Sequence, residues 1–262
     1  MFNVVAHIGR KILDVFEIFG EIFFFIRDAV CVIFQRPFFN RLYLDQMVNI
    51  GVNSMPIANL TAFFVGMVIL LQTGYQLQQF GAKLYSAGIT GVALTREMVP
   101  VFTAMVVGSR VCSSIAAELG TMKITEQIDA MWTLSVNPFK YLVAPRVVAS
   151  ITTLPIIAIY ANIVGFLGGM LVGTILLDIT PRLYYNYTLK FLYLQDVTMG
   201  LIKTIFFGAI IGLIGCYFGF RTTGGAEGVG KATTAAVVST LVLILITNYI
   251  LTAWTMFLTG SM

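Results

Sequence analysis

Charged residues are scarce in this sequence. Asp, Glu, Lys and Arg make up 11% of the 262 residues, whereas 58% are hydrophobic and the mean hydropathy is +0.90. A soluble domain of this length cannot bury so much apolar surface. The composition therefore excludes an ordinary soluble domain and predicts a polytopic integral membrane protein with lipid as its solvent.

Histidine and cysteine are equally rare. His7 is the only histidine in the sequence. Cys31, Cys112 and Cys216 lie far apart among apolar neighbours. This spacing predicts neither a disulfide framework nor a metal site, and buried packing is their expected role. No pair of acids flanks a plausible pocket, and no Ser lies in a nucleophile elbow. We therefore expect a non-catalytic chain that binds no metal.

Basic residues form no run that could hold nucleic acid, although the net charge is +4. Gly225 and Gly230 precede Lys231 with the G-x-x-x-x-G-K spacing of a P-loop. Position 232, however, is Ala, where a P-loop needs Ser or Thr to hold magnesium, and no strand precedes the motif. This excludes nucleotide binding by the chain. The first residues also lack a signal-peptide pattern, so the mature chain is expected to start at Met1.

Long apolar runs dominate instead. A helix needs about 20 apolar residues to cross the roughly 30 Å hydrocarbon core of a bilayer. Five runs approach or exceed this length, at residues 46–82, 87–117, 147–177, 204–220 and 232–262. Charges interrupt only the second run. The sequence therefore predicts an all-α integral membrane protein in which residues 46–262 form five transmembrane helices of a single membrane domain.

The N-terminal segment has a different pattern. Over residues 10–35, charged and apolar side chains separate onto opposite faces of a helix. The charged face carries Arg10, Asp14, Glu17, Glu21 and Asp28, and the apolar face carries Ile12, Phe16, Phe19, Phe23, Ile26 and Val30. Such a helix lies in the membrane interface rather than crossing it. Residues 1–45 are therefore predicted to form an interfacial amphipathic helix and an elbow.

The positions of Lys and Arg predict the orientation, because cytoplasmic connections retain positive charge during insertion. With the N-terminus inside, the inner side collects ten: Arg10, Lys11, Arg27, Arg36, Arg41, Lys123, Lys140, Arg146, Arg221 and Lys231. The outer side collects four: Lys83, Arg182, Lys190 and Lys203. Arg96 and Arg110 lie within the second span. We therefore predict an N-in/C-out topology.

Small residues recur at four-residue spacing in two of the spans. The third carries Gly165, Gly169 and Gly173, and the fourth carries Gly208 with Gly212 and Gly215 with Gly219. Such ridges allow close helix packing, within one subunit as the expected role or at a subunit interface as the alternative. The sequence shows no internal repeat, which weakens an inverted-repeat secondary transporter.

Arg96 and Glu97 lie within an otherwise apolar span. A charged side chain at mid-membrane costs roughly 2.5–3.5 kcal/mol on insertion scales. One interpretation is a structural ion pair or snorkelling toward a nearby interface, and the other is a polar cluster in a substrate cavity. Arg110, about four turns further on, should lie nearer the cytoplasm. It could meet Glu118 or lipid phosphates there, and interfacial anchoring is its expected role.

The connection between the second and third spans predicts a short amphipathic cytoplasmic helix near residues 124–134. Thr125 can cap this helix. Its apolar stripe would be Ile128, Met131 and Trp132, and its polar face would be Glu126, Gln127 and Asp129. Two interpretations are open: the helix docks into a groove of a partner, or it lies in the interface beside a solvated loop.

Several segments resemble the MlaE/YrbE permease family. The most specific are LTREMVPV at residues 94–101 and SRVCSSIAAELGTMKITEQIDA at residues 109–130. The likeness continues through NPFKYLVAPR at residues 137–146 and GGAEGVGKATT at residues 224–234. It covers nearly the whole chain after the N-terminal helix.

The resemblance implies a homodimeric permease of an Mla-type ABC transporter in the bacterial inner membrane. Such a transporter moves phospholipids between inner and outer membranes and so maintains outer-membrane lipid asymmetry. A separate cytoplasmic ATPase resembling MlaF would bind ATP and Mg, and this chain would hold no cofactor. A STAS-domain protein resembling MlaB would attach to the ATPase, and a hexameric MCE-domain protein resembling MlaD would cap the periplasmic side.

The resemblance also implies roles for individual residues. Arg96 and Glu97 would form the polar part of the lipid cavity, with Leu77 and Phe80 on its apolar wall. The residues expected to couple the chain to the ATPase are Glu118, Thr125, Glu126, Gln127 and Asp129. Two other functions stay open: an ion-coupled secondary transporter that uses the Arg96–Glu97 pair as its relay, and a non-transporting membrane scaffold.

Overall fold

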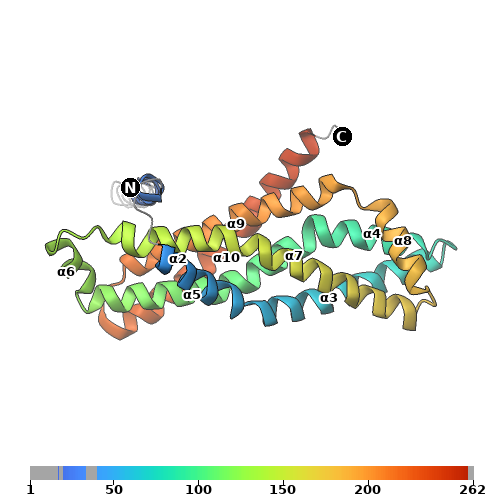
Figure 1. Ribbon diagram of the computed structural model, residues 1–262, viewed down its shortest axis with the longest axis horizontal. Helices are drawn as coiled ribbons and strands as arrows, with labels where there is room; N and C mark the ends of the chain where they lie inside the picture. The colour runs from blue at the N-terminus through green and yellow to red at the C-terminus, as the bar shows by residue number, and fades with distance from the viewer. Residues whose placement is uncertain (1–16, 18–19, 34–39, 259–262) are drawn as a thin grey trace, which may run out of the picture.

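The computed structural model describes residue 17 and residues 20–33 and 40–258, and no strand occurs among them. The chain folds into an elongated helical bundle (Figure 1). The short helix α6 (Gln127–Thr133) lies at one end of the long axis, and α4 (Tyr85–Ala93) and α8 (Pro181–Phe191) lie toward the other. The bundle therefore has two distinct ends joined by long helices.

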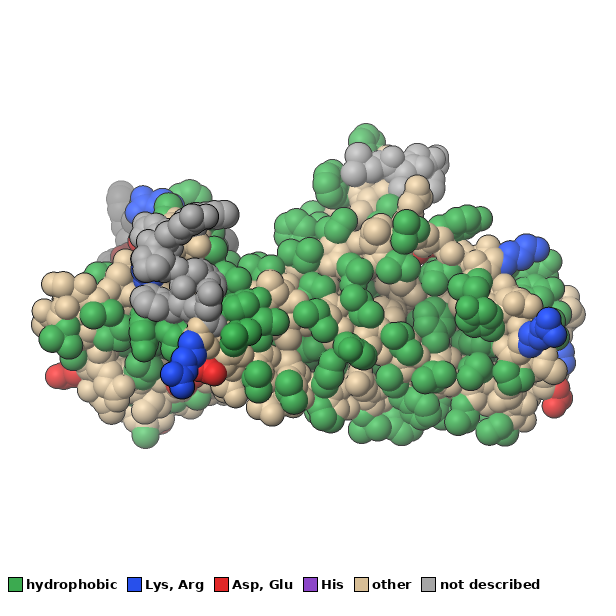
Figure 2. Space-filling view, viewed as in Figure 1, with side chains coloured by type: hydrophobic (Ala, Val, Ile, Leu, Met, Phe, Trp, Pro, Cys, Tyr) green, Lys and Arg blue, Asp and Glu red, His purple; other side chains and the backbone are tan. Residues whose placement is uncertain are grey.

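Five of these helical segments are long and apolar enough to cross a membrane: Arg41–Gln78, Tyr85–Ile124, Phe139–Ile175, Leu194–Phe220 and Gly225–Phe257. This confirms the prediction of an all-α protein with five spans. Hydrophobic side chains cover the long flank, and Lys and Arg gather toward its two ends (Figure 2). This distribution matches a body whose middle faces lipid.

The spans are built from shorter elements. The first contains α2 (Asn40–Met47), the π-helical turn η1 (Val48–Val52) and α3 (Met55–Gln78), and the second contains α4, the π-helical turn η2 (Leu94–Met98) and α5 (Val99–Ile124). The third contains η3 (Phe139–Val143) and α7 (Ala144–Ile175), the fourth is α9 (Leu194–Phe220), and the fifth is α10 (Gly225–Leu258). Two of the five spans are thus interrupted near polar residues by π-helical turns.

The fourth span begins earlier than its charge-free run, at Leu194 instead of residue 204. The assignment of Lys203 to an outer connection was therefore wrong. Lys203 lies in the tenth position of α9 and is 1% exposed. A helix can hold such a cation when neighbouring helices supply its partners, and a search for charge-free runs misses this case.

Close helix packing depends on the predicted glycine ridges. A Cβ at Gly66 of α3 would collide with the carbonyl oxygen of Gly165 in α7, and a Cβ at Gly208 of α9 would collide with the Ser150 carbonyl of α7. Gly219 of α9 packs in the same way on Leu119 of α5. These contacts confirm the prediction that the ridges pack helices within one subunit.

The N-terminal helix is described at residue 17 and over residues 20–33, so Arg10 and Asp14 of its predicted charged face lie outside the described residues. Glu21 forms an ion pair with Arg221 at 2.6 Å. The Phe25 ring packs 5.2 Å from that of Phe139 and 5.6 Å from that of Tyr217. Phe23, on the predicted apolar face, is 65% exposed. The helix therefore packs on the α6 half of the bundle and leaves apolar side chains on its outer surface.

Candidate functional site

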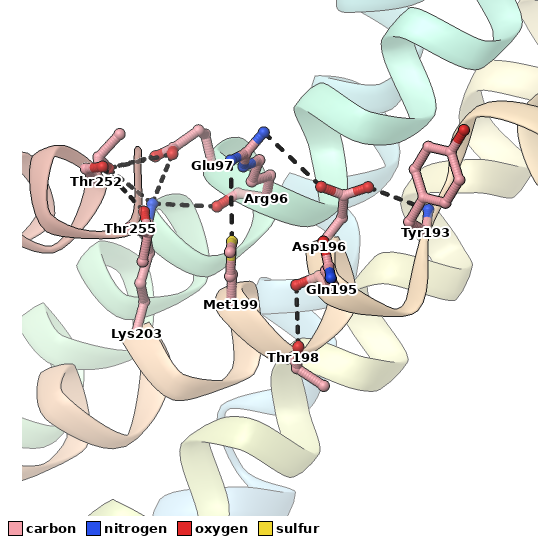
Figure 3. A network of polar contacts seen from close by, with 10 residues as sticks. All are labelled: Arg96, Glu97, Tyr193, Gln195, Asp196, Thr198, Met199, Lys203, Thr252 and Thr255. Atoms are coloured by element: carbon pink, nitrogen blue, oxygen red, sulfur yellow. Dashed lines mark hydrogen bonds and ion pairs between the residues drawn. The ribbon is translucent and has the colours of Figure 1, made fainter. Parts of the chain in front are cut away.

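A network of charged side chains lies inside the spans. Arg96 and Glu97 come from η2, Asp196 and Lys203 come from α9, and Thr252 comes from α10 (Figure 3). Segments more than 150 residues apart in sequence therefore meet at one place. The network contains two cations and two carboxylates, so its formal charge is zero.

Local sequence explains why η2 and α9 meet here. Gly200 stands between Asp196 and Lys203 on α9, and a Cβ at this position would collide with the carbonyl oxygen of Thr95 in η2. Only glycine permits this approach of the two backbones. The π-helical turn places Arg96 and Glu97 just before Pro100, which lies in the first turn of α5. Such turns widen a helix locally and are frequent at functional sites.

Lys203 is the most enclosed member of the network, with a side chain that is 2% exposed. Its Nζ donates to Glu97 Oε1 at 2.6 Å, to Thr252 Oγ1 at 2.8 Å and to the Arg96 carbonyl oxygen at 3.2 Å. An ammonium has three protons, so every donor is used. Thr252 donates in turn to Glu97 Oε1 at 3.1 Å. The Lys203 ammonium is therefore fully satisfied within the network, whereas the Glu97 side chain is 27% exposed.

Arg96 is held more loosely. Its Nη1 lies 3.8 Å from Asp196 Oδ1, and its Nη2 lies 3.9 Å from the Met199 sulfur. The second carboxylate oxygen of Asp196 accepts the backbone N–H of Tyr193 at 3.1 Å and so caps α9. The Arg96 side chain is 27% exposed. Because a guanidinium carries five N–H donors, Arg96 retains donors for a further acceptor.

The other two predicted cavity residues lie elsewhere. Leu77 is in the last turn of α3, and Phe80 is in the turn that follows, 81% exposed. The structure thus brings Arg96 and Glu97 together with α9 and α10, whereas Leu77 and Phe80 belong to the end of the first span. Their role on a cavity wall stays a prediction.

The predicted coupling residues gather around α6. Glu126 has a left-handed backbone conformation, with φ of 59°, and is the N-cap of α6, where Gln127 is the first residue. Asp129 forms an ion pair with Lys123 at 2.8 Å. The prediction that Thr125 caps α6 was wrong. Thr125 ends α5 and donates its hydroxyl to the Thr121 carbonyl at 2.9 Å, because the sharp corner at Glu126 points it back along α5.

The apolar stripe of α6 divides into buried and exposed parts. Ile128 is 2% exposed and Met131 packs against the core, whereas Trp132 is 52% exposed. Glu118 lies two turns before the end of α5 and pairs with the buried Arg146 of α7 at 2.6 Å. This pair fixes α5 to α7 just before the chain turns into α6.

Sequence reasoning missed three members of the network, Asp196, Lys203 and Thr252. A signal existed for Lys203, because it interrupts an apolar run as Arg96 does and the same reasoning applies to it. It also missed α8, whose start is marked by Thr180 before Pro181, a favoured beginning of a helix. Nothing local distinguishes Thr252 from other threonines.

Comparison with known proteins now identifies the family. The Permease MlaE family matches residues 43–254. A probable ABC transporter permease protein of Rickettsia conorii is 41% identical over 252 residues, which cover 96% of this chain and 97% of the relative. Another, from Synechocystis, is 42% identical over 248 residues, covering 95% of this chain and 91% of the relative. A chloroplastic protein of Arabidopsis thaliana, named TRIGALACTOSYLDIACYLGLYCEROL 1, is 37% identical over 211 residues, covering 80% of this chain and 60% of that protein. The chain therefore belongs to the MlaE permease family and is a transporter permease.

Proposed function

We propose that this chain is the membrane-spanning subunit of an ABC transporter that moves phospholipids between the inner and outer membranes and maintains outer-membrane lipid asymmetry. In this proposal the chain acts as a homodimer in a bacterial inner membrane, with its N-terminus in the cytoplasm. It performs no chemistry of its own, because ATP hydrolysis belongs to a partner subunit.

The observation that carries the proposal is the loosely held Arg96 in an apolar span. A phospholipid presents a phosphate and two acyl chains, so its site needs a cation beside apolar surface. Arg96 is partly exposed and its ion pair with Asp196 is long, at 3.8 Å. A phosphate can therefore compete with Asp196 for the guanidinium, while the shorter Lys203–Glu97 ion pair, at 2.6 Å, keeps the helices in place.

Two other features support the proposal. The apolar windows of the first and fifth spans are only 28% and 22% buried, against 50% for the second, which leaves apolar surface for lipid or for a second copy. The Arabidopsis relative also carries the name of a diacylglycerol glycolipid. Both agree with a lipid substrate.

The same proposal assigns α6 to the partner ATPase. Trp132 and Leu134 are 52% and 74% exposed at the tip of the bundle, beside the carboxylates of Glu126 and Asp129. Exposed apolar side chains with adjacent charges are typical of a helix that docks into a groove. A STAS-domain protein on the ATPase and an MCE-domain hexamer at the opposite end complete the proposed assembly.

The test is to extract the tagged chain from its native membrane in mild detergent and identify the proteins and lipids that co-purify by mass spectrometry. We expect a stoichiometric ATPase, an MCE-domain protein and phospholipid. Reconstituted with these partners, the complex should move phospholipid with ATP and without an ion gradient. Transport driven by a gradient alone would support the ion-coupled alternative, and the absence of both ATPase and substrate would support the scaffold.

A charge-reversal variant tests the docking surface. With Glu126→Lys and Asp129→Lys together, we expect at least a tenfold loss of ATPase stimulation, because the acidic side chains of α6 are replaced by cations. The matched control is Glu227→Lys, which reverses an exposed carboxylate outside α6, at the start of α10. Wild-type stimulation and co-purification in the double variant would refute the assignment.

A further inference from the structure

A second polar site lies in the first two spans, apart from the network. A cavity of about 250 Å³ opens between α2, η1 and α5. Its polar lining consists of Gln46, Asn49, Asn53, Arg110, Ser114 and Glu118. We call it the polar cavity. Arg110, Ser114 and Glu118 are spaced by four residues and so form one stripe on α5, two helical turns long.

Arg110 has no carboxylate partner within residues 20–33 and 40–258. Its Nη1 donates to Ser54 Oγ at 2.7 Å and approaches the Asn49 carbonyl oxygen at 3.4 Å. Glu118, the one acid of the polar cavity, pairs instead with Arg146 at 2.6 Å. Arg110 therefore keeps its remaining donors and its full positive charge in a membrane-spanning helix. Such a cation is unfavourable unless an anion or water compensates it.

Polar residues of the first span border the same cavity as Arg110. Asn49 belongs to the π-helical turn η1, and Asn53 follows at its C-terminal end. Gly51 of the same turn packs on Thr153 of α7, where a Cβ would lie 2.7 Å from Cγ2. The turn is therefore fixed by packing on one side, and its two asparagines are exposed on the other side. Their amides supply both donors and acceptors to the polar cavity.

The depth of the cavity matches lipid headgroups. Arg110 follows Glu97 by 13 residues, so the two lie about 20 Å apart along the helix. Glu118 lies about 12 Å further toward α6. A hydrocarbon core about 30 Å thick whose midplane lies between the two sites places the network and Arg110 in opposite leaflets. In that position the polar cavity extends from the headgroup level at the α6 end into the membrane.

We propose that the polar cavity binds the phosphate of a phospholipid headgroup in the leaflet at the α6 end, with Arg110 as the anchoring cation. A guanidinium donates two parallel hydrogen bonds to a phosphate. The volume equals that of about eight water molecules in the liquid, which suits a headgroup and leaves the acyl chains outside. The inference rests on the proposed function and adds a second lipid site to it.

A second copy of the chain fits this surface less well. Both copies of a membrane homodimer share one orientation, so their two-fold axis runs along the membrane normal. Equivalent residues then lie at equal depth, and an axis that passes beside the polar cavity would bring Arg110 close to Arg110 of the other copy. Like charges repel, whereas a phosphate compensates each arginine separately.

Labelling of a cysteine inside the polar cavity provides a local test. In the full chain with Cys31→Ser, S114C is reacted with a small methanethiosulfonate reagent in detergent. Cys112 and Cys216 are buried, which limits background labelling. Phosphatidylethanolamine should slow labelling at least fivefold, and diacylglycerol with the same acyl chains should not. Equal labelling rates with and without phosphatidylethanolamine would overturn the proposal.

The Asn53→Asp variant then distinguishes an Arg110 that binds phosphate from an Arg110 with a structural role. It adds a carboxylate beside Arg110, which would stabilise an arginine with a structural role but repels a phosphate. We expect protection by phosphatidylethanolamine to be lost, whereas the matched Asn186→Asp control in α8 retains it. Full protection in Asn53→Asp would refute phosphate binding at Arg110.

Two further measurements distinguish inorganic phosphate from phospholipid, and this inference from the proposed function. Protection by inorganic phosphate but not by phosphatidylethanolamine would overturn the lipid assignment. If the chain transports phospholipid with ATP but S114C stays unprotected, only this inference is overturned. Protection of S114C in a chain that moves no phospholipid would support the polar cavity and count against the proposed function.

Discussion

The network at η2 and the polar cavity at η1 differ in how the charge of an arginine in a membrane-spanning helix is compensated. Each combines a π-helical turn with an arginine of the second span, Arg96 or Arg110. The network collects two cations and two carboxylates, and Lys203 uses every donor. Arg110 reaches only a hydroxyl and a carbonyl among the described residues. Charge compensation is internal in the first site and missing in the second.

This difference separates structural charge from available charge. Removing one partner of a buried ion pair strongly destabilises the fold, because the remaining charge is neither paired nor solvated. Removing the partner of a cation that borders an open polar cavity costs little stability, because water replaces that partner. Three substitutions measure this contrast, from the largest expected effect to the smallest.

Replacing Lys203 by Met should have the largest effect. The Glu97 carboxylate would lose its 2.6 Å partner inside the bundle. We expect a loss of about 3–5 kcal/mol in the free energy of unfolding, measured by denaturant titration in detergent. The double variant E97Q/K203M removes both charges and should recover most of this loss. A double variant as unstable as K203M would show that the pair is not the cause.

Replacing Gly200 by Ala should have an intermediate effect. The new Cβ collides with the Thr95 carbonyl and separates α9 from η2. We expect destabilisation of about 1–3 kcal/mol in the same titration. Gly230→Ala is the matched control, because no atom lies within 4 Å of its Cβ position. Equal stability of the two variants would contradict the close contact at η2.

Replacing Ser54 by Ala should have the smallest effect. Ser54 accepts from Arg110 at 2.7 Å and makes no side-chain cap for α3. Because the guanidinium borders an open cavity, we expect a loss of about 0.5–1.5 kcal/mol. Ser109→Ala, which removes a hydroxyl that bonds within α5, serves as the control. A loss comparable to that of K203M would place Arg110 among the structural charges and weaken its proposed role in lipid binding.

Most of the fold follows from the sequence, because lipid imposes a simple rule on span length. Five apolar runs predict the five spans, and only their ends differ. The fourth span starts early because Asp196 caps α9 and Lys203 is compensated from η2 and α10. The compensation of Lys203 is not visible in a linear search, since Arg96 and Thr252 are distant from it in sequence.

The candidate site was predictable only in part. Arg96 and Glu97 stand out because they interrupt an apolar run, whereas Thr252 becomes a partner of Lys203 only through packing of α10 on α9. The sequence also suggested that Arg110 could meet Glu118. The structure pairs Glu118 with Arg146 instead, because η3 and α7 return past α5 at that level.

The second span also connects α6 to both arginine sites. Residues from Tyr85 to Ile124 form a nearly continuous helical rod, about 60 Å long at 1.5 Å per residue, with α6 at one end. Measured from Ile124, Arg110 lies about 21 Å and Arg96 about 42 Å along the rod. A tilt about the α6 end would therefore displace Arg96 twice as far as Arg110. Such a tilt would move the two sites by unequal distances.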